Sequence, residues 1–278
     1  MDTRKFLIRA LAASAILLMS WGAQAQVADV LSPHNLSTTG PDAGSTTTQV
    51  CVYCHTPHAG DTANTVPLWN KSAVSVEGDF NRYSTLGTVT FDATEANVGS
   101  VSMACLTCHD GVQAMDVAIN ASGRDLGPGF IDTGARTMPG TNTIAVLGTD
   151  LRDDHPISMQ YAAGGLTDAG VPAAGAPPAI VSAAYGDPDF EDPYAMTLNQ
   201  TAVWWLDVAD GANNPGLRDK SDVLLYTRND LGGTVEPFVE CGSCHDPHNY
   251  GTFTAGDSVA FLRVPNDSSQ ICTACHDK

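Results

Sequence analysis

All eight cysteines of this 278-residue chain follow one pattern, which constrains the fold more than any other feature of the sequence. They form four C-x-x-C pairs, each followed at once by histidine: CVYCH at 51–55, CLTCH at 105–109, CGSCH at 241–245 and CTACH at 272–276. C-x-x-C-H is the attachment signature of c-type haem, since two thiols bond the two vinyl groups of one porphyrin and the next imidazole reaches the iron. The sequence therefore predicts four covalently bound haem c groups.

The predicted attachment and ligand residues follow directly from these motifs. The attachment residues are Cys51, Cys54, Cys105, Cys108, Cys241, Cys244, Cys272 and Cys275. The proximal iron ligands are His55, His109, His245 and His276. Two competing interpretations are four disulfides in an exported chain and two zinc sites of four thiolates each. Neither requires a histidine directly after the second cysteine, so haem is the preferred interpretation.

Four histidines lie outside the proximal positions, and they match the number of distal ligands that four six-coordinate irons need. They are His34, His58, His155 and His248. The sequence therefore predicts iron with two histidine ligands at all four sites, and comparatively low reduction potentials. The alternative distal ligand is methionine, which would raise the potential of its haem. The candidates are Met103, Met115, Met138, Met159 and Met196.

An internal duplication organises the chain. Each half contains an upstream histidine, then C-x-x-C-H-x-P-H, then C-x-x-C-H-D. A histidine three residues after the proximal one stays on the same side of the iron, so it must serve a different haem; Pro57 and Pro247 stiffen this connection. We predict a signal segment at 1–25, a first two-haem unit at 26–150 and a second at 151–278 with a long loop and hairpin insertion. The two units are expected to form one haem-cored domain.

The expected fold class is a multihaem cytochrome c that is mostly coil, with short helices and one or two β-hairpins around a core of four haems. The segments 222–227 and 235–240 flank a turn-rich RNDLGG and predict one hairpin leading into CGSCH. The Gly- and Pro-rich stretch 170–179 predicts a surface loop. Trp204 and Trp205 either shield a haem or pack in a small cluster. Few large apolar residues are spaced to build a core, so the haems are expected to fill the interior and no stable fold is expected without them.

Charge and the N-terminus restrict the function class and location. The chain has 13 Lys and Arg against 31 Asp and Glu, a net charge of -18. This excludes nucleic-acid binding, which needs clustered basic residues. Residues 1–25 combine basic residues, a short apolar stretch and an Ala-Gln-Ala cleavage pattern, as in a secretory signal. The apolar stretch is shorter than the ~20 residues of a membrane span. We expect an exported protein without a membrane span.

The motifs resemble those of a known group of cytochromes. HNLS at 34–37, DDHPIS at 153–158 and the four C-x-x-C-H motifs together resemble the doubled-CxxCH tetrahaem outer-surface cytochromes of metal-reducing bacteria, of the OmcE type. That resemblance implies a homopolymer, an extracellular filament in which haems form a continuous stacked chain and a histidine of one subunit binds a haem of the next. His58 is the first candidate for that ligand and His34 the second. His248 would serve a haem of the first unit in its own chain.

Electron transfer is the leading functional hypothesis, because six-coordinate haems leave no open iron position for a substrate. The protein is therefore not expected to be an enzyme, and its other partners would be redox cytochromes. One alternative is a monomeric periplasmic shuttle with all eight histidine ligands in its own chain. A second is a multihaem reductase, which needs one five-coordinate haem with a distal acid or base.

Overall fold

The computed structural model describes residues 30–41, 47–62, 66–72, 79–87, 93–113, 115, 118–120, 138, 144–182, 187–208, 216–229, 231–248 and 261–277. All eight cysteines and all eight histidines lie within these ranges. The predicted signal segment at 1–25 lies outside them. None of the helices in these ranges is both long enough and apolar enough to cross a bilayer.

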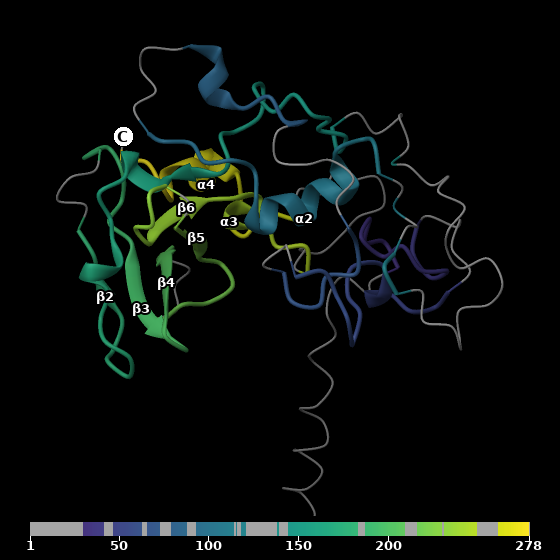
Figure 1. Ribbon diagram of the computed structural model, residues 1–278, viewed down its shortest axis with the longest axis horizontal. Coiled ribbons are helices and arrows are strands. Elements are labelled where there is room, and N and C mark those ends of the chain that lie inside the picture. The colour runs from purple at the N-terminus through teal and green to yellow at the C-terminus, as the bar shows by residue number, and fades with distance from the viewer. Residues whose placement is uncertain are drawn as a thin grey trace, which may run out of the picture.

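An antiparallel sheet dominates the described part of the chain, with strand order β1-β6-β5-β4-β3-β2 (Figure 1). Its strands are β1 (Met159–Gln160), β2 (Ala179–Ile180), β3 (Tyr194–Leu198), β4 (Thr201–Leu206), β5 (Val223–Arg228) and β6 (Glu236–Val239). The helices are short: α2 (Ser100–His109), α3 (Cys241–Cys244) and α4 (Gln270–Thr273). Turns of 3₁₀ helix lie at Cys51–Tyr53, Tyr83–Leu86, Tyr161–Ala163, Asp168–Gly170 and Asp267–Ser269.

The hairpin expected before the third motif is confirmed. Strands β5 and β6 pair antiparallel, with Tyr226 opposite Phe238 and Arg228 opposite Glu236. The sheet is nevertheless larger than the one or two hairpins expected, because β3 and β4 add a second long pair. The Gly- and Pro-rich stretch 170–179 is exposed or half-buried throughout, as expected of a surface loop, and leads into β2.

A two-residue turn joins β3 to β4. Asn199 and Gln200 have φ values of 50° and 66°, and the flanking residues Leu198 and Thr201 are paired across the hairpin. Positive φ at both central positions is the mark of a type I′ turn, whose twist matches that of the paired strands. This hairpin could not be predicted from the sequence, because Asn-Gln lacks the glycine that usually signals such a turn.

The expectation that the protein lacks an apolar core of its own is wrong for the second half. The largest cluster packs residues of the sheet and its neighbours: Tyr161, Ala162, Leu166, Val181, Ala195, Ala202, Trp204, Leu206, Val223, Leu225, Val239 and Val264. Successive residues of a strand face opposite sides of a sheet, yet Trp204 and Trp205 are both 0 % exposed, so both faces of β4 are covered. Ordinary packing therefore accounts for Trp204. Ile271 and Cys275 pack against this core, so the sheet supports the fourth motif.

The edge of the sheet beyond β1 leads into α2, which carries the second motif. Glu95 is bridged to Met159, while Gln160 N–H donates to the Thr94 carbonyl (3.0 Å) and Ala96 N–H to the Ser158 carbonyl (2.7 Å). A second core packs Phe80, Val98, Met103, Leu106 and Leu151 around this helix. In Figure 1, α2 lies between the sheet and the N-terminal segment drawn in purple and blue.

Candidate functional site

The first motif is held by two backbone hydrogen bonds to a segment further along the chain. Thr56, directly after the proximal histidine, donates its N–H to the Leu68 carbonyl (2.9 Å). Two residues on, Asn70 N–H donates to the carbonyl of Cys54 (2.8 Å). His55 is thereby bridged to Trp69. We call this pair of hydrogen bonds the motif clamp.

The third motif has the same clamp. Asp246 N–H donates to the Phe261 carbonyl (2.8 Å), and Arg263 N–H donates to the Cys244 carbonyl (2.8 Å). Phe261 has φ 53° and the equivalent residue of the first clamp, Leu68, has φ 55°. Both residues thus take a left-handed conformation that side chains other than glycine rarely adopt. The duplication seen in the sequence is therefore also a duplication of local backbone geometry.

The fourth motif repeats the clamp with the segment that connects β2 to β3. Asp277 N–H donates to the Asp189 carbonyl (2.8 Å), and Glu191 N–H donates to the Cys275 carbonyl (2.9 Å). The bridged residue is Phe190, whose ring lies 4.4 Å from that of His276. A cavity of about 1090 Å³ adjoins this motif, between the sheet and α4. Volumes of this order hold drug-sized ligands in other proteins.

The second motif is built differently, because it forms the C-terminal end of α2. The His109 carbonyl accepts hydrogen bonds from the N–H groups of Leu147 (2.9 Å) and Gly148 (3.3 Å). The ring is fixed as well, since His109 Nδ1 lies 2.6 Å from the Ala145 carbonyl. The segment 145–148 therefore holds both the backbone and the ring of this histidine.

Two proximal histidines are oriented as metal ligands usually are. His55 Nδ1 lies 2.8 Å from the Pro67 carbonyl, as His109 Nδ1 does from Ala145. A carbonyl only accepts hydrogen bonds, so Nδ1 carries the proton and Nε2 keeps its lone pair. Metal-binding imidazoles commonly have their second nitrogen fixed in this way.

Each motif lies near the motif that follows it in the sequence. A thiol of each one interacts electrostatically with a thiol of the next, and the pairs are Cys54 and Cys108, Cys105 and Cys241, and Cys244 and Cys275. The middle pair shares a hydrogen bond. Burial raises the pKa of the Cys54 and Cys275 thiols to about 12, and the neighbouring thiol of each pair adds to the rise. The Cys54 and Cys275 thiols are therefore uncharged at neutral pH.

Two pairs of histidines lie at the separation that a shared metal requires. The ring centroids of His55 and His248 are 6.0 Å apart, and those of His34 and His109 are 6.2 Å apart. A metal–imidazole bond is about 2 Å and a ring centroid lies roughly 1 Å beyond its nitrogen, so two rings on one metal lie roughly 6 Å apart. The interplanar angles of 19° and 74° are both compatible, because each ring can rotate about its metal bond.

His34 lies among residues of the second and third motifs. Its ring stacks on Phe261 at 4.2 Å and is hydrogen bonded to the Pro247 carbonyl. Burial, with a smaller contribution from the neighbouring His109, lowers the pKa of His34 to about 4. The ring is therefore neutral at pH 7, which is the form that binds metals. This placement in its own chain makes His34 the weaker candidate for an intersubunit ligand.

His58 and His155 are both exposed. His155 Nδ1 lies 3.0 Å from the Pro156 carbonyl, and within the described residues neither ring contacts another aromatic or imidazole ring. Of the alternative methionine ligands, Met103 lies in the core around α2 and Met196 in β3. The distal ligands of all four motifs remain predictions.

The residues present fit haem better than zinc or disulfides. All eight cysteines are free. Among the residues described, no group of three or more His, Cys, Asp or Glu side chains could hold a metal ion, whereas each zinc site would need four thiolates together. A haem iron takes only its two axial ligands from the protein. Beside the first motif, the buried Trp69 Nε1 has no hydrogen-bond partner among the described residues, so a donor is available there to a bound polar group.

A buried polar cluster joins the second motif to the third, and sequence reasoning missed it. Glu240, directly before Cys241, accepts hydrogen bonds from Ser102 Oγ (2.5 Å), Ser158 Oγ (3.1 Å) and Arg228 (2.8 Å). Ser102 Oγ in turn accepts the Cys241 N–H (2.9 Å). Burial raises the pKa of Glu240, while its hydrogen bonds and Arg228 oppose this. The one signal in the sequence was a charged residue directly before a motif.

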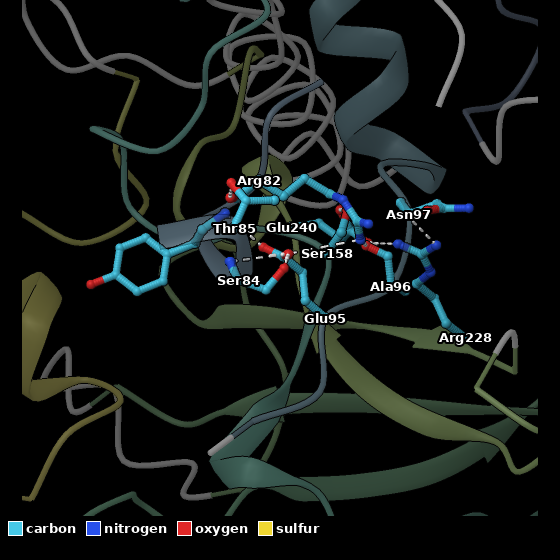
Figure 2. Close-up of polar contacts among 10 residues, drawn as sticks. Arg82, Ser84, Thr85, Glu95, Ala96, Asn97, Ser158, Arg228 and Glu240 are labelled. Carbon is cyan, nitrogen blue, oxygen red and sulfur yellow. Dashed lines mark hydrogen bonds and ion pairs between the residues drawn. The ribbon is translucent and has the colours of Figure 1, made fainter. Parts of the chain in front are cut away.

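Figure 2 shows how this cluster reaches the segment before α2. The Arg228 guanidinium donates a hydrogen bond to the Asn97 carbonyl (2.7 Å), and the Arg82 guanidinium donates one to the Ala96 carbonyl (2.5 Å). Glu95 accepts the Tyr83 N–H (3.1 Å) and lies 3.7 Å from Arg82. The sheet therefore fixes the positions of the second and third motifs through buried charges as well as through backbone pairing.

Comparison with known proteins adds no family to these observations. No protein-family model matches the chain, and no curated protein or solved structure is similar enough to count as a match. The resemblance to tetrahaem outer-surface cytochromes therefore rests on the motifs alone.

Proposed function

We propose that this protein transfers electrons through four covalently bound haem c groups, one on each C-x-x-C-H motif. One observation carries the proposal: the fold brings C-x-x-C-H motifs of both units together, since the His55 ring lies 6.0 Å from that of His248 and the Cys241 N–H donates to Ser102 of the helix that carries the second motif. When bound, each haem supplies an iron that exchanges one electron reversibly. A protein that places four such groups in a row is suited to conduction along the row.

The side chains have separate roles in this proposal. The eight cysteines attach the haems, and His55, His109, His245 and His276 are the proximal ligands. His248 is the distal ligand paired with His55, and His34 the one paired with His109, as their ring separations of 6.0 and 6.2 Å support. A second histidine on each iron would leave no position for a substrate, so the proposal gives the protein no catalytic role of its own.

We further propose that the protein acts outside the cell as a subunit of a cytochrome filament. The support is the resemblance of the motifs and the exposure of His58, a side chain that a neighbouring subunit can reach. His58 is therefore the preferred intersubunit ligand. The alternative is a monomeric periplasmic shuttle, in which His58 and His155 both serve the chain's own third and fourth motifs.

Carbon monoxide tests the electron-transfer proposal against a multihaem reductase. The gas binds reduced haem only where an axial position is open. We expect the purified protein to be reduced and reoxidised reversibly, and its reduced spectrum to be unchanged under carbon monoxide. Binding at one haem in every chain would instead favour the reductase.

Electron microscopy of the native protein separates the two electron-transfer alternatives. Filaments with a regular repeat would support the proposed polymer. Compact particles of single-chain mass would favour the shuttle. A His58→Ala variant that retains its haems yet no longer polymerises would assign His58 as the intersubunit ligand.

A further inference from the structure

Lys71 is a buried positive charge next to the first two motifs. It is 0 % exposed, and within the described part of the chain it is the one Lys or Arg residue that is fully buried. Its Nζ donates a hydrogen bond to the Met115 carbonyl (2.7 Å). An ammonium group in such a place is costly to desolvate, and the hydrogen bond to the carbonyl offsets part of that cost.

The backbone places Lys71 between the first motif and the second. It directly follows Asn70, the clamp residue that bonds the Cys54 carbonyl (2.8 Å). Met115 lies six positions after His109, so the side chain spans the junction of the two motifs. Burial raises the pKa of the thiols of Cys54 and Cys108, and at both of them the Lys71 ammonium opposes the rise. The positive charge of Lys71 therefore acts on a thiol of the first motif and on a thiol of the second.

The second unit has a different charge arrangement: its clamp cation is Arg263, one position earlier, and the guanidinium lies 3.6 Å from the Asp246 carboxylate. The matching clamps align Asn70 with Arg263, and therefore Lys71 with Val264. Val264 is also buried, at 2 % exposure, but it lies in the apolar core. The residues that directly follow the second and fourth motifs do not differ in charge between the units, because Asp110 and Asp277 are both aspartates.

We infer that Lys71 raises the reduction potentials of the haems held by the first and second motifs. This inference rests on the proposed function. Adding an electron to a haem adds a negative charge, which a nearby buried cation stabilises because little water screens it. Asp110 acts in the opposite direction beside His109, but its Oδ1 accepts the N–H groups of Val112 (2.9 Å) and Gln113 (3.0 Å). Lys71 thereby favours the reduced state of the two haems of the first unit.

The test compares reduction potentials in four variants of the full-length, haem-loaded protein. Lys71→Met and Lys71→Gln remove the charge, and Lys71→Gln keeps a donor for the Met115 carbonyl. Lys71→Arg keeps the charge. Lys220→Met removes an exposed charge in the second unit. Each variant is titrated electrochemically at pH 7 while haem absorbance is recorded, and covalent haem is counted separately by intact mass.

We expect both neutral variants to lower the potentials of two of the four haems. The ratio of reduced to oxidised haem at a fixed potential should fall about tenfold, which is about 59 mV for a one-electron couple. Lys71→Arg and Lys220→Met should each leave the four potentials within about a third of that shift.

Two results would overturn the inference. One is unchanged potentials in both neutral variants. The other is an equal fall in Lys71→Arg, which would show that packing rather than charge is responsible. Absence of covalent haem in the unmodified protein would instead reject the proposed function itself, so the two failures are distinguishable. If Lys71→Met fails to load haem, Lys71→Gln and Lys71→Arg still decide the question.

Discussion

The clamps of the first and third motifs have the same hydrogen bonds but different surroundings. In the third, β6 leads directly into the motif, and Phe261 is 8 % exposed and stacks on His34. In the first, the equivalent Leu68 is 50 % exposed, and the buried residues that follow it include the charged Lys71. A short pattern of backbone hydrogen bonds thus fixes the motif geometry, while the surroundings set its stability and its electrostatics.

The largest expected effect tests whether the second half is held by its own apolar core. Trp204→Ala should destabilise the protein by about 4 kcal/mol, because it empties a fully buried position in β4. Denaturant unfolding followed by far-ultraviolet circular dichroism measures this. Leu198→Ala, at a half-exposed position of the same hairpin, is the control and should cost less than about 1 kcal/mol. Equal effects of the two changes would mean that the bound haems, rather than the sheet, support this half.

The next effect concerns the connection between the halves. Glu240→Ala should cost about 3 kcal/mol, because it leaves Arg228 buried without its carboxylate. Replacing both residues with methionine should cost less than the single change, since no buried charge then remains. A double-mutant cycle of Glu240→Met, Arg228→Met and the combined change, built from unfolding curves, measures the coupling. Additive effects of the two single changes would contradict the proposed pairing.

A matched pair of substitutions compares the clamps directly. Phe261→Gly should cost about 2 kcal/mol, because the roughly 3–5 kcal/mol for losing a buried aromatic ring exceeds the roughly 1–2 kcal/mol of relieved left-handed strain. Leu68→Gly should change stability by less than about 1 kcal/mol, because the strain relief is similar and little packing is lost. Thermal unfolding of both variants measures the difference. A larger loss for Leu68→Gly would reverse the comparison.

The smallest effect lies in the turn between β3 and β4, outside any motif. Gln200→Gly should stabilise the protein by about 0.5 kcal/mol, because Asn-Gly suits a type I′ turn better than Asn-Gln. The change in the midpoint of denaturant unfolding measures it. Destabilisation would show that this turn is not strained by its positive φ values.

Local patterns predicted one hairpin of the sheet and marked the candidate site. The spacing of cysteine and histidine identified the four motifs, and alternating apolar residues around RNDLGG identified the β5–β6 hairpin. These features are readable because all their residues lie close together in sequence. The β3–β4 hairpin was missed because Asn199-Gln200 resembles no common turn signal.

The remaining features depend on contacts between distant residues, which no local pattern records. The fourth clamp joins Asp277 to Asp189, and the polar cluster joins Ser102 to Glu240. The approach of His248 to His55 likewise crosses the two units. Such pairs form because the sheet brings the segments together, so they emerge only with the fold.

Intact-mass measurement of the protein purified from its producing cells tests the central claim most directly. Unlike non-covalent haem, thioether-linked haem remains attached after denaturation. The account predicts a mass increase equal to four haem groups, falling to three when both cysteines of any one motif are replaced by alanine. A chain with no added mass, or with its cysteines joined in disulfides, would contradict it.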